Sequence, residues 1–428
     1  MKLLIKNGTV IDPLQNFNKL ADVLVEDGVI VALGKLPEAA AQSADEVIDA
    51  TGLWITPGFI DIHVHFREPG QEGKETLATG SRAAAAGGFT TVLVMPNTVP
   101  PIDTPELVRW VSERAKDDAI MEILICGAIT QGRKGEQLTD MVRMHRAGAS
   151  AFSDDGDPIA NAFIMRNALE YSTLTGVPIM DHCEDHHLSC GGCMNEGKIS
   201  TLLGLPGIPH SSEDTIVARD LLLAEEFGGH IHICHISSGR SVDLVRQFKA
   251  RGVKVTCETT PHYFSVTDEI VQGYNTYAKM NPPLRESKDQ SEIIKGLQDG
   301  TIDAIATDHA PHHEDNKKLE FPSAAFGIIG LETSWALTYT NLVKTKKLSL
   351  EDAISLLTHR PAGVLGLDRG SLKKGSDANL TLIDPKRKWT FGPEHVQSKS
   401  KNSPFYGWNL ESKVVRTIYK GKSVYIDL

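Results

Sequence analysis

The chain has 428 residues, too many for one small domain but suited to an α/β barrel with an appended module. Its apolar fraction of 41% is typical of a globular protein with a large buried core, and 44 basic against 55 acidic residues leave a net charge of -11. Because no Lys/Arg block is long enough for a phosphate-binding stripe, we expect no nucleic-acid partner. No apolar run reaches the roughly 20 residues of a membrane-spanning helix. The N-terminus shows no signal-peptide cleavage pattern, so we expect a cytoplasmic protein without membrane contact.

Both ends of the chain have the alternating pattern of β-strands. Near the N-terminus, "LLIKNGTVID" and "ADVLVEDGVIVALG" contain Asn-Gly and Asp-Gly, the strongest short hairpin signals. Near the C-terminus, the same alternating pattern occurs in "GSLKKGSDANLTLIDP" and "KVVRTIYKGKSVYID". The sequence therefore predicts a small β-sandwich domain built from residues 1–56 plus 369–428.

Between these ends, residues 57–368 alternate short apolar runs with Ala-, Leu- and Glu-rich helical stretches. The runs cover residues 59–66, 90–96, 122–129, 150–156, 177–183, 231–237, 254–262 and 302–310. Eight such units predict a TIM-type (β/α)8 barrel, because a parallel strand buried on both faces has a continuous apolar sequence. An open doubly wound sheet is the alternative. The irregular polar stretch 310–327 is expected to be a mobile lid.

The six cysteines do not predict a disulfide framework. Four of them lie singly inside expected strands, where a buried, reduced thiol is the ordinary state. Cys190 and Cys193 have the CxxC spacing of a metal site, but no second CxxC follows. We expect them to be loop residues, with a structural metal as the alternative.

Polar residues stand where several of the apolar runs end. His63 and His65 are two positions apart, so in a strand they face the same side. His182, His235 and Asp308 end the fifth, sixth and eighth runs. Because catalytic groups of barrel enzymes lie at the carboxyl ends of the strands, these side chains should converge. Imidazoles and carboxylates together favour a divalent ion such as zinc.

Because successive strand residues face opposite sides, the sequence also indicates which residues next to the expected metal ligands cannot reach the metal. Of Asp154 and Asp155, only one should reach the barrel axis, and the other should cap or turn the loop. Cys183 and Cys234 should point away from the metal by the same parity. His232 falls too early in its strand to reach the mouth. His262 and His313 stay undecided.

The expected reaction is hydrolysis or its reverse. A divalent ion that is open to water lowers the pKa of that water and polarises a carbonyl. A carboxylate beside the ion can take a proton from the water and pass it to a leaving nitrogen, and Asp308 is placed for this role. The alternative for Asp308 is a helix cap.

Two long segments resemble the signature segments of the dihydroorotase family, which belongs to the amidohydrolase superfamily. They are "DIHVHFREPGQEGKETLATGSRAAAAGGFTTVLVMPNT" and "ATDHAPH". The likeness extends through "DDG", "GGCMNEG", "HICHISS", "NPPLR" and "SPFYGW", so it covers nearly the whole chain. It implies a barrel with a β-sandwich, one or two zinc ions, and the reversible cyclisation of N-carbamoyl-L-aspartate to L-dihydroorotate in pyrimidine synthesis.

The resemblance also implies a role for particular residues. His63 and His65 would hold one zinc ion, His182 and His235 the second, and Asp155 would bridge them. Asp308 would bind the first ion and act as general acid and base. Arg67, Asn97 and His312 would bind the substrate carboxylate, and backbone groups near Asn281 and Gly327 the ring amides. From the residues alone, Arg67 shares strand parity with His63, and its guanidinium matches a carboxylate with two parallel hydrogen bonds.

Asp155 departs from many superfamily members, which carry a carboxylated lysine at the end of strand four. We therefore expect two metal sites of unequal affinity. The alternatives are a hydantoinase or allantoinase, which act on uncharged rings, and an inactive scaffold that assembles with aspartate transcarbamoylase. The expected partners are the small-molecule substrate, a second copy of the chain in a homodimer, and aspartate transcarbamoylase.

Overall fold

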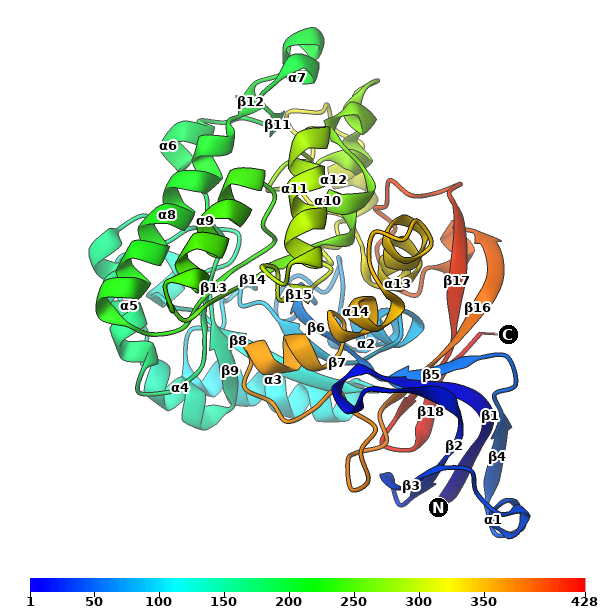
Figure 1. Ribbon diagram of the computed structural model, residues 1–428. Coiled ribbons are helices and arrows are strands. Elements are labelled where there is room, and N and C mark those ends of the chain that lie inside the picture. Colours follow the sequence, from blue (N-terminus) through cyan, green and yellow to red (C-terminus); the bar gives the residue numbers. More distant parts are fainter. Residues whose placement is uncertain (428) are drawn as a thin grey trace.

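A computed structural model describes residues 1–427 of the protein. Its centre is a sheet of eight parallel strands in the order β15-β14-β13-β10-β9-β8-β7-β6 (Figure 1). The strands are β6 Phe59–Val64, β7 Phe89–Val94, β8 Glu122–Gly127, β9 Ala149–Phe152, β10 Ile179–Asp181, β13 Ile231–Ile233, β14 Val255–Thr259 and β15 Ala304–Ile305. Each lies within one of the eight apolar runs or begins one residue before it, so the predicted barrel is confirmed.

The two edges of this sheet meet, which distinguishes the barrel from an open sheet. Val64 forms a parallel bridge with His309, and the His65 N–H donates to the His309 carbonyl at 2.9 Å. Every residue of β6 and of β7 is buried. Their side chains alternate between a core inside the barrel, with Ile62 and Leu93, and a larger core under the outer helices. Burial on both faces accounts for the continuous apolar runs.

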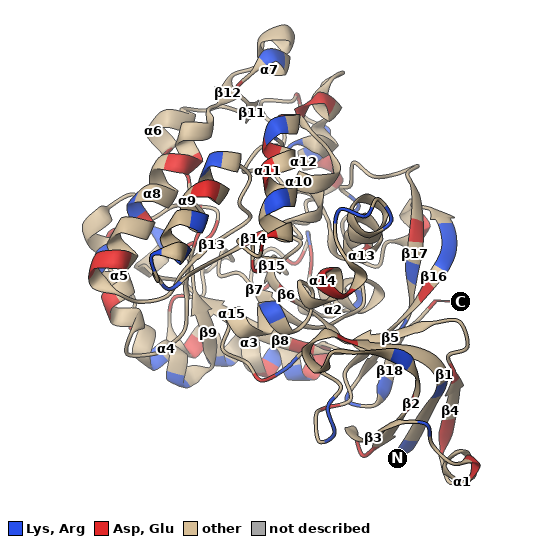
Figure 2. Ribbon diagram, in the orientation of Figure 1, with Lys and Arg blue, Asp and Glu red and all other residues tan. Residues whose placement is uncertain are grey.

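Helices cover the outside of the barrel and extend its loops. They are α2 Leu77–Ala86, α3 Pro105–Asp118, α4 Met141–Ala147, α5 Ala162–Ser172, α6 His186–Ser189, α7 Lys198–Leu203, α8 His210–Phe227, α9 Gly239–Ala250, α10 Pro261–Ser265, α11 Ser287–Gln298, α12 Glu314–Lys317, α13 Ser334–Thr338, α14 Leu350–Ser355 and α15 His359–Val364. Both signs of charge are interspersed over α8, α9 and α11 (Figure 2). Among the described residues, no helix has the length and apolarity to cross a bilayer.

Strands from both termini form a second sheet, in the order β18-β17-β16-β5-β1-β2-β3, with β4 paired to β1. They are β1 Lys2–Asp12, β2 Phe17–Glu26, β3 Val29–Gly34, β4 Glu46–Asp49, β5 Trp54–Pro57, β16 Leu380–Thr390, β17 Asn409–Tyr419 and β18 Lys422–Ile426, with α1 Glu38–Gln42 between β3 and β4. This sheet has its own apolar core, which includes Ile5, Val23 and Leu380. The β-sandwich of two chain ends is thus confirmed, while its residue boundaries stay a prediction.

One of the two expected N-terminal hairpins is absent. Asp27 and Gly28, with φ of 49° and 81°, do turn β2 into β3. Asn7, with φ of 61°, instead makes a register shift inside a continuous β1. A Cβ at Gly8 would lie 2.4 Å from the Cδ1 atom of Ile55, so a larger residue at this bulge would require the Ile55 side chain to move.

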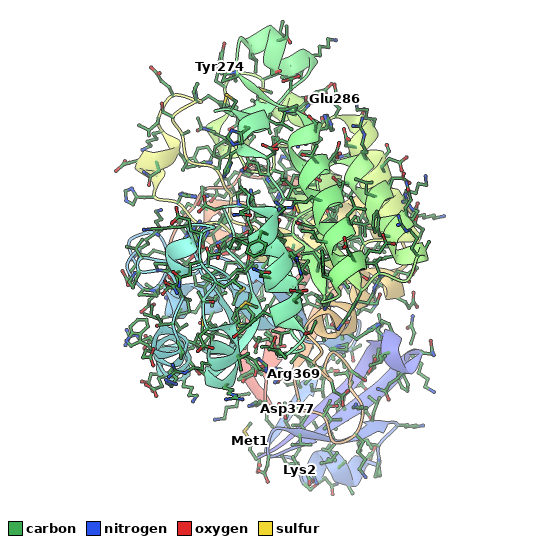
Figure 3. All side chains as sticks on the ribbon, turned by 90° about the vertical axis from the view of Figure 1, so that its left-hand side faces the viewer. Met1, Lys2, Tyr274, Glu286, Arg369 and Asp377 are labelled. Carbon is green, nitrogen blue, oxygen red and sulfur yellow. The ribbon has the colours of Figure 1, made fainter. Side chains whose placement is uncertain are left out.

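Helix α7 projects from the barrel together with the short strands β11 Met194–Asn195 and β12 Gly207–Ile208. The β-domain lies at the opposite end of the molecule from this projection (Figure 1). In Figure 3, Arg369 and Asp377 lie between the barrel and the β-domain. They line a cavity of about 290 Å³ together with Gly58 and Ile60, which begin β6. That cavity is therefore at the other end of the strand from His63.

The stretch 310–327, expected to be a mobile lid, contains α12 and is bonded to its surroundings by two buried lysines. The Lys279 ammonium donates to the carbonyls of Phe321, Pro322 and Ala324 at 2.6–2.9 Å. Lys317 donates to three further carbonyls at 2.7–3.2 Å. Because an ammonium has three protons, each lysine is fully satisfied without a carboxylate. This bonding indicates an ordered loop.

Candidate metal centre and active site

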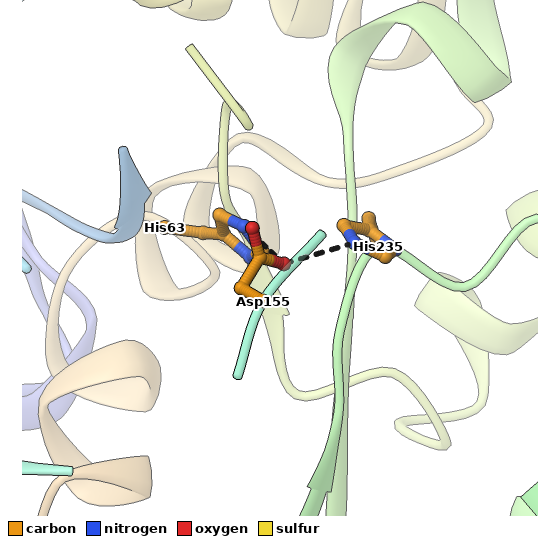
Figure 4. Close-up of side chains that lie close together, drawn as sticks. All are labelled: His63, Asp155 and His235. Carbon is orange, nitrogen blue, oxygen red and sulfur yellow. Dashed lines mark ion pairs between the residues drawn. The ribbon is translucent and has the colours of Figure 1, made fainter. Parts of the chain in front are cut away.

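Asp155 lies at the centre of a ring of histidines at the carboxyl ends of the barrel strands. Its Oδ1 atom is 3.2 Å from His63 Nε2 and 3.5 Å from His235 Nε2 (Figure 4). The same oxygen is 3.9 Å from His182 Nδ1, which is itself 2.9 Å from His235 Nε2. Strands four, five and six thus contribute side chains to one point, as the sequence predicts.

A second group of ligand-type atoms also meets at His63 Nε2. Asp308 Oδ1 is 3.0 Å from His65 Nε2 and 3.7 Å from His63 Nε2. Asp155 Oδ2 is 3.5 Å from His65 Nε2, so Asp155 contacts both groups. His63 lies on β6 and His65 directly follows the end of that strand, and both imidazoles face Asp308, as predicted for this pair.

The outward nitrogens of three of these rings are bonded to side-chain oxygens. His63 Nδ1 donates to Glu258 Oε1 at 2.7 Å, and His65 Nδ1 donates to Asn97 Oδ1 at 2.9 Å. His182 Nε2 donates in the same way to a neighbouring carboxylate, Glu184 Oε2, at 3.2 Å. Such partners fix the orientation of a ring, so the other nitrogen of each ring faces the centre.

The arrangement fits a divalent cation. His63 Nε2 and Asp155 Oδ1 are buried and have no hydrogen-bond partner, although buried polar atoms are almost always bonded. Sets of ligand atoms within 4.8 Å of one another include His63, Asp155 and His235, and also His63, His65 and Asp308. Neutral imidazole nitrogen and carboxylate oxygen are ligands that zinc accepts. The residues therefore suit up to two zinc ions that share Asp155.

Three residues at the strand ends have left-handed backbone conformations. The φ angles are 62° at Arg67, 32° at His235 and 46° at Asp308. Residues other than glycine adopt this region at a cost, and such conformations gather at functional sites. Because β6 ends at Val64 and Arg67 is left-handed, the strand-parity argument for Arg67 is wrong, although its side chain still reaches the site.

The charges of the centre depend on its burial. Burial alone would raise the pKa of Asp155 and of Asp308, but the histidine hydrogen bonds and charges outweigh it and lower both pKa values below their usual range. Burial lowers the pKa of Arg67 to about 10, which leaves this side chain charged at neutral pH. Burial and the charge of Arg67 lower the pKa of His312 to about 2, so this ring is neutral.

Arg67 and His312 form a polar wall beside the candidate metal centre. Arg67 Nη2 lies 3.5 Å from His312 Nε2, and Arg67 Nε is buried without a partner. Both side chains are thus available to an anion. A cavity of about 420 Å³ adjoins His312 and is lined also by Tyr277 and Tyr406.

Comparison with known proteins agrees with this geometry. A model of the family described as "Dihydro-orotase-like" matches residues 52–241, and one described as "Amidohydrolase family" matches residues 295–425. The chain is 52% identical over 425 residues to the dihydroorotase of Citrifermentans bemidjiense, covering 99% of this chain and 100% of that protein. It is 48% identical to the dihydroorotase of Pelotomaculum thermopropionicum, covering 100% and 99%. The chain belongs to the dihydroorotase family.

Solved structures of hydantoinases share the fold of this dihydroorotase-family chain. The L-hydantoinase of Arthrobacter aurescens is 25% identical with a TM-score of 0.89, covering 100% of this chain and 97% of that one. The D-hydantoinase of a Thermus species is 26% identical with a TM-score of 0.84, covering 99% and 95%. The barrel with a terminal β-domain is therefore an amidohydrolase fold.

Within this family member, some residues make contacts that the sequence did not indicate. Asn97, expected at the substrate carboxylate, bonds His65 and also donates to Asp155 Oδ2 at 3.4 Å. The Gly327 N–H donates to the Lys279 carbonyl at 2.9 Å, so this amide is already bonded inside the protein. The roles of Asn97 and Gly327 at the substrate stay predictions.

Other residues adjoin the centre or lie outside it. The Asn281 side chain donates to Glu184 at 2.7 Å, beside His182. Asp154 turns away and accepts the Ile129 N–H at 2.8 Å, as the parity argument requires.

The prediction that Cys183 and Cys234 both point away from the metal holds for only one of them. Cys183 points away from the centre, toward the carboxylates of Asp181 and Asp220. The expectation for Cys234 is wrong, because its thiol faces the barrel interior and belongs to a ligand-type group with His63 and a glutamate. Among residues 1–427, the groups able to share an ion include neither Cys190, which is exposed, nor Cys193.

Sequence reasoning missed two carboxylates, Glu184 and Glu258. Glu258 is fully buried inside the seventh apolar run. A charged residue within a buried strand is costly unless it is paired, and this was the available signal. Glu184 follows His182 by two positions and has a pKa lowered below its usual range by the His182 hydrogen bond, against the effect of burial.

Proposed function

We propose that the protein is a zinc-dependent dihydroorotase, which interconverts N-carbamoyl-L-aspartate and L-dihydroorotate plus water in pyrimidine synthesis. The observation that carries this proposal is the meeting of His63, His182, His235 and Asp308 around Asp155, with Arg67 beside them. This arrangement supports a cyclic amide with a carboxylate substituent as the substrate, because the proposed metal-binding residues lie near the cationic side chain of Arg67.

The chain's own residues divide into two ligand sets. His63, His65 and Asp308 would hold one zinc ion, and His182 and His235 the other, with Asp155 shared. A divalent cation held there lowers the pKa of a bound water and polarises the amide carbonyl. Because the short Asp155 side chain must serve both sites, we propose that their affinities differ. Zinc that never exceeds one ion per chain after careful loading would contradict this.

Asp308 is the group proposed to move the proton. Its side chain is 10% exposed, whereas Asp155 is 3% exposed, so Asp308 is the more accessible of the two carboxylates. Its low pKa keeps Asp308 ionised, and we propose that this carboxylate takes the proton from the attacking water. The water oxygen bonds to the carbonyl carbon as its proton moves to Asp308. The ring C–N bond then breaks, and Asp308 passes that proton to the departing nitrogen.

Arg67 and His312 are proposed to bind the substrate carboxylate. The charged guanidinium supplies two parallel donors, which a lysine in its place could not. His312 is neutral, so it adds one N–H donor without a second charge. Backbone groups near Asn281 and Gly327 are proposed to hold the ring amides.

Turnover and metal content together test the function. The purified protein, with zinc measured per chain, is assayed for ring opening of dihydroorotate and, separately, of hydantoin. We expect zinc-dependent turnover of dihydroorotate and far slower turnover of hydantoin, because hydantoin has no carboxylate for Arg67. Preference for hydantoin would support the hydantoinase alternative. Absence of turnover of either ring by zinc-loaded protein would support the scaffold alternative.

We further propose, from the family resemblance, a homodimer and association with aspartate transcarbamoylase. Analytical ultracentrifugation of the chain alone tests the first, with a monomer as the contradicting result. Sedimentation with the transcarbamoylase of the same organism tests the second. Two separate boundaries would contradict the association.

A further inference from the structure

A row of buried polar side chains in close contact runs through the barrel interior beneath the candidate metal centre. It starts at Glu258 on β14, whose Oε1 accepts from His63 Nδ1 at 2.7 Å. The other carboxylate oxygen, Oε2, is 3.3 Å from His232 Nε2 on β13. The side chains of His63, His232 and Glu258 are 0% exposed. Water therefore does not compete for these contacts.

The row continues away from the centre toward the amino ends of the strands. His232 Nδ1 is 2.8 Å from Thr256 Oγ1, and the same hydroxyl is 2.8 Å from His230 Nε2. His232 and Thr256 are register partners on adjacent parallel strands. Residues two apart on a strand share a face, so His230 and His232 point inward together, as do Thr256 and Glu258. The strand geometry thus lines up all four side chains.

Glu258 contacts two candidate metal ligands at once. In addition to the His63 ring, its Oε1 accepts the backbone N–H of His235 at 3.4 Å. His235 is left-handed at this position, with φ of 32°, so its backbone is one of the strained points of the site. A single carboxylate therefore holds the ring of one ligand and the main chain of another.

We propose that Glu258 is a positioning residue of the metal centre, which holds the His63 ring so that Nε2 faces inward. His232 in turn holds Glu258, with Thr256 fixing the His232 ring. The carboxylate also makes the imidazole a stronger ligand, because a hydrogen bond from Nδ1 to an anion increases electron density at Nε2. The inference rests on the metal-dependent function proposed above.

The test measures metal affinity rather than turnover. The zinc dissociation constant is determined by chelator competition for the parent protein and for Glu258→Leu, which has a similar size but no polar atoms. We expect an increase of about 10–100-fold, the usual effect of losing such a partner. Glu258→Gln should give a smaller increase, because its amide oxygen still accepts from His63 although the charge is lost. If the Leu variant does not fold, the Gln variant still tests the proposal.

Two further variants separate positioning from general destabilisation. His232→Gln should raise the dissociation constant in the same direction but less, although His232 is no ligand. Asp12→Asn is the matched control, because Asp12 is a fully buried carboxylate of the β-domain that accepts the Leu372 N–H at 2.6 Å. It should lower the thermal midpoint of the metal-free protein and leave zinc affinity unchanged.

The outcomes are distinguishable. Zinc affinity of Glu258→Leu and Glu258→Gln within about threefold of the parent would overturn the positioning role and leave the proposed function intact. A parent protein that binds no zinc would overturn both. The visible spectrum of the cobalt-substituted protein gives a second readout, since a displaced His63 ring changes the ligand geometry at the ion.

Discussion

Replacing Asp308 by asparagine removes the proposed proton carrier while keeping the shape of the side chain. Asp308 Oδ1 is the atom that faces His65 and His63, at 3.0 and 3.7 Å. The asparagine of the variant can place its amide oxygen there, so we expect much of the metal to remain. Its amide nitrogen cannot accept a proton. Loss of a general acid and base alone slows a reaction by about 10²–10⁴-fold, or about 3–5 kcal/mol in the barrier.

The assay is dihydroorotate hydrolysis at saturating substrate, with zinc content and the thermal midpoint measured on the same preparation. Asp303→Asn is the matched control, since Asp303 precedes β15 at the opposite end of that strand and pairs with Lys249 at 2.6 Å. It should retain the parental kcat. If Asp308→Asn carries the parental zinc content and keeps more than about a tenth of the activity, the assignment of Asp308 is refuted.

Three further predictions concern the substrate, the metal and the loop. Arg67→Lys should raise KM for dihydroorotate about tenfold or more with a smaller change in kcat, because a point charge replaces a bidentate donor; an unchanged KM would contradict the carboxylate contact. Chelator should lower the thermal midpoint of the parent protein, because zinc at 100 times its dissociation constant stabilises the fold by about 2.7 kcal/mol; equal midpoints with and without metal would exclude tight binding. Lys317→Met should cost about 1–3 kcal/mol in urea unfolding, because it leaves the carbonyl of Ala325 without a donor. Unchanged or higher stability would show that burying the ammonium costs as much as its bonds supply.

The barrel could be predicted from the sequence because each parallel strand is buried on both faces and therefore continuous in apolar residues. The same property hid Glu258, since the single acidic residue in "KVTCETTPH" does not break the pattern. Its role depends on His63 and His232, which lie on other strands. Only the three-dimensional register brings these atoms within 2.7 and 3.3 Å.

Local backbone geometry limited the remaining predictions. Parity placed His63 and His65 well because the pairing of β6 with His309 continues to His65, and it failed for Arg67 because that residue has a left-handed backbone. In the same way, Asn7 was read as a turn although the pairing of β1 with its neighbours continues past it. A left-handed residue can make a bulge or a hairpin, and long-range pairing decides between them.

The second sheet has a consequence for synthesis on the ribosome. The Thr56 hydroxyl lies 3.4 Å from the Thr381 carbonyl across paired strands, and the two residues are 325 positions apart. At about 5–20 residues per second, β5 waits on the order of tens of seconds for β16 to be made. Throughout that interval the nascent chain exposes an unpaired edge of apolar strand. Such an edge is a template for mispairing, so chaperone contact should concentrate on the first sixty or so residues.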